Sequence, residues 1–239
     1  QTFALTPSTG YHVDSIFVDG VYAGAGTSVT LNNITSNHTV SVKFAINTYT
    51  ITVTQGVNGT IAPGTTTVNY GANQTFTITA NTGYYVDSVF VDGAYVGAAT
   101  SVSFNTITDN HTVSAKYAAT IFSIFVSTPT NGSITPSGTI TIAYGGSQTF
   151  TVTPNTGYHI DSIFVNGVYV GNTSPFTINN ITGNQTIVVK FAINTYTIAA
   201  SAGSNGSITP SGNVTVNYGS NQTFALTPST GYHVDSIFV

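Results

Sequence analysis

The sequence predicts an all-β fold, a tandem array of antiparallel β-sandwich or β-grasp-like modules of about 74 residues without helices. Three observations predict it. The chain is rich in Thr, Val, Ile, Tyr, Phe, Asn and Gly and lacks Glu and Arg, a composition that favours strands over helices. Apolar and polar residues alternate with a period of two, and a short motif recurs along the whole chain.

The recurring motif sets the domain organisation. Gln-Thr-Phe begins at Gln1, Gln74, Gln148 and Gln222, in steps of 73, 74 and 74 residues, which is typical of a tandem array. We predict a partial module 1 over residues 1–46, complete modules 2 and 3 over 47–119 and 120–193, and a partial module 4 over 194–239. The chain begins within a module, which indicates an internal or processed piece of a longer protein.

The period of two within a module predicts strands that are buried on one face. Between His38 and Phe44, Val40, Val42 and Phe44 alternate with polar residues, a pattern typical of a half-buried antiparallel strand. Similar segments predict about six or seven short strands in each module. No Pro, Gly or Ser linker separates one module from the next, so the joints are expected to be semi-rigid.

Dipeptides that favour tight turns separate these segments. Because Asn-Gly and Asp-Gly readily adopt positive φ angles, they predict type I′ hairpins between neighbouring strands. Such dipeptides begin at Asn58, Asn131 and Asn205, and at Asp19, Asp92 and Asn166.

The charge pattern excludes several classes of protein. Only 4% of residues are charged, against about 25% in a typical soluble protein, and the net charge is −4. The three lysines form no basic patch, so nucleic acid is not an expected partner. No apolar run reaches the 18–20 residues of a membrane helix, so no membrane insertion is expected of this segment. The absence of cysteine leaves the modules to fold by packing alone.

Two stretches of module 2 resemble a known repeat. Residues 70–97, YGANQTFTITANTGYYVDSVFVDGAYVG, and 100–117, TSVSFNTITDNHTVSAKY, are similar to the divergent internalin B-type repeat of bacterial and archaeal surface proteins. The resemblance extends to every module, and it implies a small β-grasp-like or sandwich-like fold that acts as a spacer or stalk. The Trp of more typical copies is replaced here by Ile16, Val89, Ile163 and Ile237.

The most frequent chemical motif is the glycosylation sequon Asn-x-Ser/Thr. It occurs at Asn33, Asn37, Asn58, Asn73, Asn110, Asn131, Asn172, Asn180, Asn184, Asn205, Asn213 and Asn221. Glycans would supply solubility to a surface with few charges and would block the pairing of strand edges between chains. The alternative is that Asn-Gly turns and Thr-rich strands create the sequons by accident.

Other polar candidates favour structural roles. His12 and Asp14, which recur as His159–Asp161 and His233–Asp235, would share one face of a strand, but Tyr85 replaces the His in module 2. We therefore expect an exposed hydrogen-bonded pair, not a metal site. We predict that Lys43, Lys116 and Lys190 are solvated charges that discourage sheet pairing, not members of a Lys-Asn cross-link.

The regular tyrosines fall into two groups. Tyr11, Tyr84, Tyr158 and Tyr232 follow Gly and are expected in the core or at corners. Tyr22, Tyr95 and Tyr169 follow the Asp-Gly or Asn-Gly turns and are better candidates for exposed contacts such as sugar stacking.

No catalytic residues, cofactors or metal ligands are predicted. Asp14 with Asp19, and Asp87 with Asp92, are the only acids that lie close in sequence, and Asn166 replaces the second acid in module 3. We expect a secreted or cell-surface structural protein that is N-glycosylated and forms a fibre or stalk through its own modules or through further copies. An adhesin that binds glycan or a host ligand through module loops is the alternative, and an ice-binding array is a more distant one.

Overall fold

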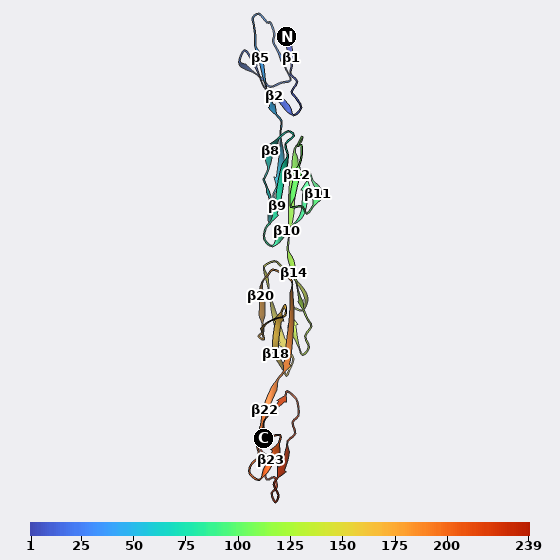
Figure 1. Cartoon of the computed structure of the whole chain (residues 1–239), viewed down its shortest axis with the longest axis vertical. Helices are drawn as coiled ribbons and strands as arrows, with labels where there is room; N and C mark the ends of the chain where they lie inside the picture. The colour runs from blue at the N-terminus through green and yellow to red at the C-terminus, as the bar shows by residue number, and fades with distance from the viewer. The chain divides into compact units, whose positions relative to one another are not determined.

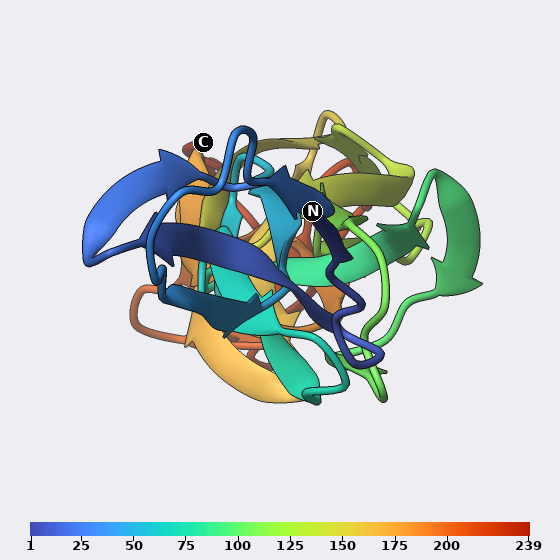
Figure 2. The ribbon, with the colours of Figure 1, turned by 90° about the horizontal axis from the view of Figure 1, so that it is seen from above.

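The computed structural model describes residues 1–239, which divide into two compact units, Gln1–Thr120 and Ile121–Val239. Modules 1 and 2 lie in the first unit, and modules 3 and 4 lie in the second. The strands can be followed in Figure 1 and, after a turn of 90°, in Figure 2. The chain contains no helix, and therefore none that could span a membrane.

The partial modules contain fewer strands than the complete ones. Module 1 contains β1 (Thr2–Ala4), β2 (Tyr11–Val18), β3 (Val21–Gly24), β4 (Ser28–Thr30) and β5 (Val40–Ile46). Module 4 contains β22 (Thr195–Ala200), β23 (Gly206–Thr209), β24 (Gly212–Asn217) and β25 (Ala225–Pro228).

Each complete module contains eight strands, not the six or seven predicted. Module 2 contains β6 (Thr48–Thr54), β7 (Gly59–Ala62), β8 (Thr66–Asn69), β9 (Gln74–Ala80), β10 (Tyr84–Val91), β11 (Ala94–Gly97), β12 (Ser101–Phe104) and β13 (His111–Ala119). Module 3 contains β14 (Ile121–Val126), β15 (Gly132–Thr135), β16 (Gly138–Ala143), β17 (Gly146–Pro154), β18 (Tyr158–Val165), β19 (Val168–Gly171), β20 (Phe176–Ile181) and β21 (Gln185–Ile193).

A complete module is a two-layer sandwich around one apolar core. In module 2 a five-stranded sheet, β11-β10-β13-β6-β8, faces a three-stranded sheet, β12-β9-β7. Both sheets supply inward side chains to the core, which comprises Ile51, Ile61, Phe76, Ile78, Val89, Ile107, Val113 and Ala115. Module 3 repeats the arrangement, with sheets β16-β14-β21-β18-β19 and β15-β17-β20. The predicted all-β fold class is therefore confirmed. The predicted alternation holds in these modules, but Phe44, expected on the buried face of its strand, is 46% exposed in partial module 1.

The first and last strands of each complete module pair in parallel, which the sequence pattern did not indicate. β6 lies beside β13, with His111 opposite Ile51, and β14 lies beside β21, with Ile124 opposite Gln185. All other pairs in these sheets are antiparallel, as predicted. The parallel pair is central in its sheet, so the chain enters a module at one end of the five-stranded sheet and leaves at the other.

The turn predictions are correct for one set of dipeptides and wrong for the other. Asp19 and Gly20 have φ angles of 50° and 81°, and they connect the antiparallel pair β2 and β3 as predicted. Asn58 has a φ of 70°, but it connects β6 to β7, which belong to different sheets. Gly59 is needed there because a Cβ would overlap the Tyr117 ring, and Gly132 meets Phe191 in the same way.

Candidate functional site

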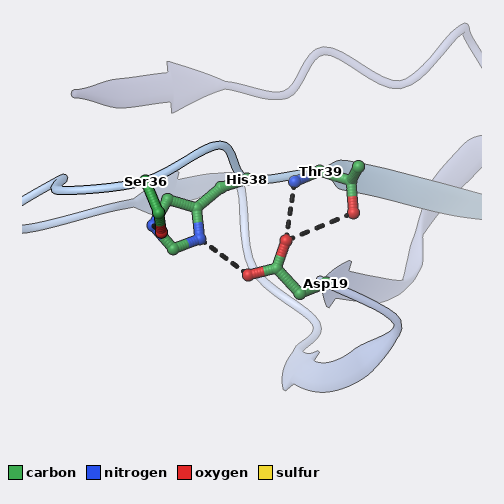
Figure 3. A network of polar contacts seen from close by, with 4 residues as sticks. All are labelled: Asp19, Ser36, His38 and Thr39. Atoms are coloured by element: carbon green, nitrogen blue, oxygen red, sulfur yellow. Dashed lines mark hydrogen bonds and ion pairs between the residues drawn. The ribbon is translucent and has the colours of Figure 1, made fainter.

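A polar cluster repeats beside the Asp-Gly turn, which in module 1 connects β2 to β3 and lies next to the residues just before β5. The Asp19 carboxylate accepts hydrogen bonds from His38 Nδ1 at 2.7 Å, from the Thr39 backbone N–H at 2.7 Å and from the Thr39 hydroxyl at 3.3 Å (Figure 3). The Asp19 backbone N–H in turn donates to the Thr39 carbonyl oxygen at 2.9 Å. The cluster therefore clamps the turn to the strand that follows 20 residues later.

The clamp recurs with charge in module 2 and without charge in module 3. Asp92 accepts from His111 Nδ1 and from the Thr112 backbone N–H, both at 2.7 Å. In module 3, the Asn166 side-chain oxygen accepts from the Thr186 N–H at 2.8 Å, and its nitrogen donates to Gln185 at 2.7 Å. Asp and His are thus replaced together by two amides, which keep the bond from the backbone N–H and reverse the donor and acceptor of the side-chain bond.

The clamp shifts the titration of its carboxylates. Hydrogen bonds from His38 and from the Thr39 N–H lower the pKa of Asp19 below its usual value of 3.8. Burial acts to raise the pKa of Asp92, but the hydrogen bonds from His111 and Thr112 outweigh it, and the net pKa is also lowered. The neutral amides of module 3 cannot titrate in this way.

The predicted His12–Asp14 pair does not form. His12 and Asp14 are both exposed, and a bulge between Val13 and Ser15 leaves Asp14 without a partner in the strand register. Asp14 instead accepts from the Ser15 hydroxyl at 3.0 Å, and His12 Nδ1 donates to the side-chain oxygen of Asn47 at 2.8 Å. His159 and Asn194 repeat the latter bond at 2.8 Å.

Asn47 and Asn194 hold the junctions between modules. The Asn47 N–H donates to the Gly10 carbonyl of module 1 at 2.8 Å, and its own carbonyl accepts from the Tyr70 N–H of module 2 at 2.8 Å. Gly10 has a φ of 81°, and a Cβ added there would overlap the Tyr70 ring. This residue therefore has both a conformational and a steric reason to be glycine.

The same junction forms between modules 3 and 4. Asn194 bonds to the Gly157 carbonyl and to the Tyr218 N–H, both at 2.8 Å, and a Cβ on Gly157 would overlap the Tyr218 ring. At the end of module 2, Thr120 keeps the backbone bond to the Gly83 carbonyl at 2.8 Å. Tyr85 and Thr120 stand where His and Asn stand at the other junctions, so both partners of the side-chain bond are exchanged together.

The sequon asparagines are accessible, and several have structural roles of their own. Eleven of the twelve are exposed, and Asn58 is half-buried. The side-chain oxygens of Asn110 and Asn184 accept from the N–H groups of Thr50 and Ser123 at 2.7 and 2.9 Å. Their side-chain nitrogens, the atoms to which an N-glycan is attached, have no protein partner.

The predicted role of the lysines as edge charges is wrong for the complete modules, although Lys43 lies on β5, an edge strand of partial module 1. Lys116 and Lys190 lie on β13 and β21, which are central strands, and so face solvent from the middle of a sheet. Lys43, Lys116 and Lys190 hold their Nζ atoms 5.4, 5.4 and 5.2 Å from the ring centroids of Phe17, Phe90 and Phe164. The apolar pattern of each strand identified the solvated face but gave no information on the order of strands.

Exposed tyrosines complete this aromatic surface. Tyr22, Tyr95 and Tyr169 meet the same phenylalanines edge to face at 6.0, 5.9 and 6.0 Å between centroids. They are 61%, 64% and 56% exposed, in agreement with the prediction for residues after the turns. The tyrosines expected in the core or at corners are outside the core, and Tyr11, Tyr84 and Tyr232 are exposed, because strands β2 and β10 begin at the rim of the sandwich.

The sequence indicated some of these groups and missed others. His38 and His111 were not among the predicted polar residues. The sequence does contain a signal for them, because module 3 has Gln185 in place of the His and Asn166 in place of the Asp. Asn47 and Asn194 were placed at module boundaries without a bonding role. No group of three or more His, Asp or Glu side chains that could hold a metal ion is present.

The chain consists of tandem two-layer β modules whose junctions are held by hydrogen bonds, so it is a repeat protein. The comparison with protein families matches residues 49–121, 122–195 and 196–237 to the divergent InlB B-repeat domain. The chain belongs to this family, a repeat domain of bacterial-surface type. The comparison with curated proteins finds no match.

The two kinds of clamp are expected to respond differently to acid. Because the folded-state pKa of Asp92 is lowered, its clamp stabilises the fold above the carboxyl's unfolded pKa and is lost as pH falls through the lower folded value. The amide signal of Thr112 should therefore shift below about pH 3.8 in an NMR titration, while that of Thr186 stays constant. Asp92→Asn should remove the shift at Thr112, and an unchanged titration in this variant would contradict the assignment.

The junction glycine is expected to be more sensitive than a glycine of similar conformation elsewhere. Gly10→Ala and Gly71→Ala should both cost about 1–2 kcal/mol from the left-handed backbone, but only Gly10 has a ring within reach of the added carbon. We expect a larger loss of unfolding free energy for Gly10→Ala in chemical denaturation, together with displaced Tyr70 ring signals. Equal losses would show that the ring contact adds nothing.

Proposed function

We propose that the chain is part of an extracellular structural array that acts as a stalk or fibre. The parallel pairing of the first and last strands carries this proposal. If these strands were antiparallel neighbours, the chain would leave a module near the point where it entered. Pairing β6 with β13 instead places entry and exit at opposite ends of the sheet, so each added module can extend the protein.

The junctions support the same function. Each of Asn47 and Asn194 bonds the backbone of both modules that it joins, and a Gly–Tyr contact packs beside it. A joint of this kind transmits load through backbone hydrogen bonds and ring packing, whereas a flexible linker connects two modules without fixing their orientation. Spacing is therefore the mechanism that we assign to the modules.

Covalent glycans are part of this proposal. Asn110 and Asn184 are the strongest candidates, because the bond to the side-chain oxygen holds the amide while its nitrogen faces solvent. Asn37 is the equivalent residue of module 1 and is also exposed. With 4% charged residues, the surface lacks the repulsion that keeps most soluble proteins apart, and hydrated glycans would replace it.

The test is electron microscopy of the native source, with averaging along any fibre whose repeat matches one module. We expect continuous filaments with added density at Asn37, Asn110 and Asn184, and glycopeptides containing these residues in mass spectrometry. Bare asparagines throughout would refute the glycan assignment. A protein found only inside cells, without filaments or stalks, would refute the structural function.

An adhesive role is the second candidate, and the exposed Tyr–Phe–Lys clusters favour it. Tyr22, Tyr95 and Tyr169 each present an accessible ring against a phenylalanine that a lysine covers, a combination that can stack on sugars and donate hydrogen bonds to them.

On a glycan array, the unmodified chain should then bind at least one saccharide. Tyr95→Ala should weaken the binding, and Tyr85→Ala, at a tyrosine that is 51% exposed and outside the cluster, should not. Equal effects of the two changes, or no binding at all, would remove this candidate.

A further inference from the structure

The five-stranded sheet of module 3 ends in a long edge strand, β16, with unpaired backbone groups. β16 pairs with β14 along all six of its residues, and Thr141 lies opposite Ser123. The Ser123 N–H bonds to Asn184 and so points away from β16. In an antiparallel pair this places the N–H and C=O of Thr141 outward, and alternation does the same for Thr139 and Ala143. Within its unit, β16 has no second neighbour.

The equivalent edge of module 2 is shorter. The chain is one residue shorter before β8, which comprises only Thr66–Asn69. The hydroxyl of Thr65 accepts the Val53 N–H at 2.9 Å, at the position where β16 continues as a strand. Module 2 therefore offers four edge residues where module 3 offers six.

The equivalent edge of module 4 carries a sequon. β24 has the same length as β16, but Asn213, opposite Ala199, occupies the place that Thr139 holds opposite Phe125. Asn213 is exposed, and a glycan on it would project from the edge strand. β16 contains neither a sequon nor a proline.

Other devices protect the remaining edges of module 3. β19, the opposite edge of the sheet, has four residues and follows a bulge between Ile163 and Phe164. β20 of the smaller sheet is interrupted by Asn180, which has a φ of 50° and lies in a sequon. No lysine lies on any of these strands. β15, the other edge of the smaller sheet, has four residues and is followed by Pro136. β16 is thus the unprotected edge of the module.

We propose that β16 pairs antiparallel with β16 of a second copy and joins two sheets into one. In the two-fold register, Thr141 lies opposite Thr141 of the second copy, and Ile140 lies opposite its Ile142. Both isoleucines face the core side and both threonines face solvent. In this register, therefore, core-side residues of one copy lie beside core-side residues of the other, and solvent-facing residues lie beside solvent-facing ones. This pairing rests on the proposed structural function and names the surface through which copies associate.

Disulfide trapping tests the contact directly, because the chain contains no cysteine. Paired Thr141 residues would have Cα atoms about 5.5 Å apart, within the range of a disulfide. Under mild oxidation of the full unglycosylated chain, Thr141→Cys should form covalent dimers about tenfold faster than Thr67→Cys, since pairing raises the local thiol concentration. Thr67 is the equivalent residue on the short edge β8. Equal rates would overturn the proposal.

Sedimentation velocity supplies an independent readout on variants without cysteine. Thr141→Lys should lower concentration-dependent association because it places a charge at the edge strand, and Thr141→Pro should lower it because an outward N–H is lost. The control Thr67→Lys should leave the association unchanged. Circular dichroism verifies that each variant is folded. Unchanged association in both folded Thr141 variants would overturn the pairing, while native filaments and glycopeptides would still establish the structural function.

Discussion

The parallel pair of β6 and β13 is the interaction on which the rest of the architecture depends. It places the first strand of module 2 in the middle of the sheet, next to the last, and so closes the module around its core. It also directs the chain out of the module at the end opposite to its entry. The following residue, Thr120, is then positioned to bond the Gly83 carbonyl before module 3 begins. Closure of a module and continuation of the array are thus consequences of one pairing.

Local pattern predicted the layers of this fold but not the neighbours within them. Alternation identified the buried faces, including Val113 on β13, because side-chain direction depends only on the strand itself. Strand order depends on contacts between distant residues, and that is why the parallel pair and the central place of Lys116 were missed. Asn58-Gly59 shows the same limit, since its Gly is required by the Tyr117 ring, far away in sequence.

The candidate sites also combine features that local sequence predicts with contacts that depend on distant residues. Asparagine at a sequon could be recognised from three residues, but its structural role could not. Asn110 accepts the Thr50 N–H across the parallel pair, which brings together residues 60 positions apart. The His12–Asn47 bond was equally hidden, because its two residues are 35 positions apart. The exchange of both partners for Tyr85 and Thr120 in another module was the one sequence signal that could have revealed it.

The chain has few charged residues, and those of the clamps and of the aromatic clusters each make a defined contact. Two aspartates clamp turns with the help of histidine, and all three lysines cover phenylalanine rings. The lysines of the complete modules lie on central strands, so none is left there for the sheet edges that lysine commonly protects. The edges are then protected by bulges and by strand length, which differs between the equivalent strands β8 and β16, and the proposed glycans would add to this protection. A repeated core with variable edges lets neighbouring modules share a scaffold while their surfaces differ. Position along the array, and not the fold itself, therefore determines which surface is free to bind.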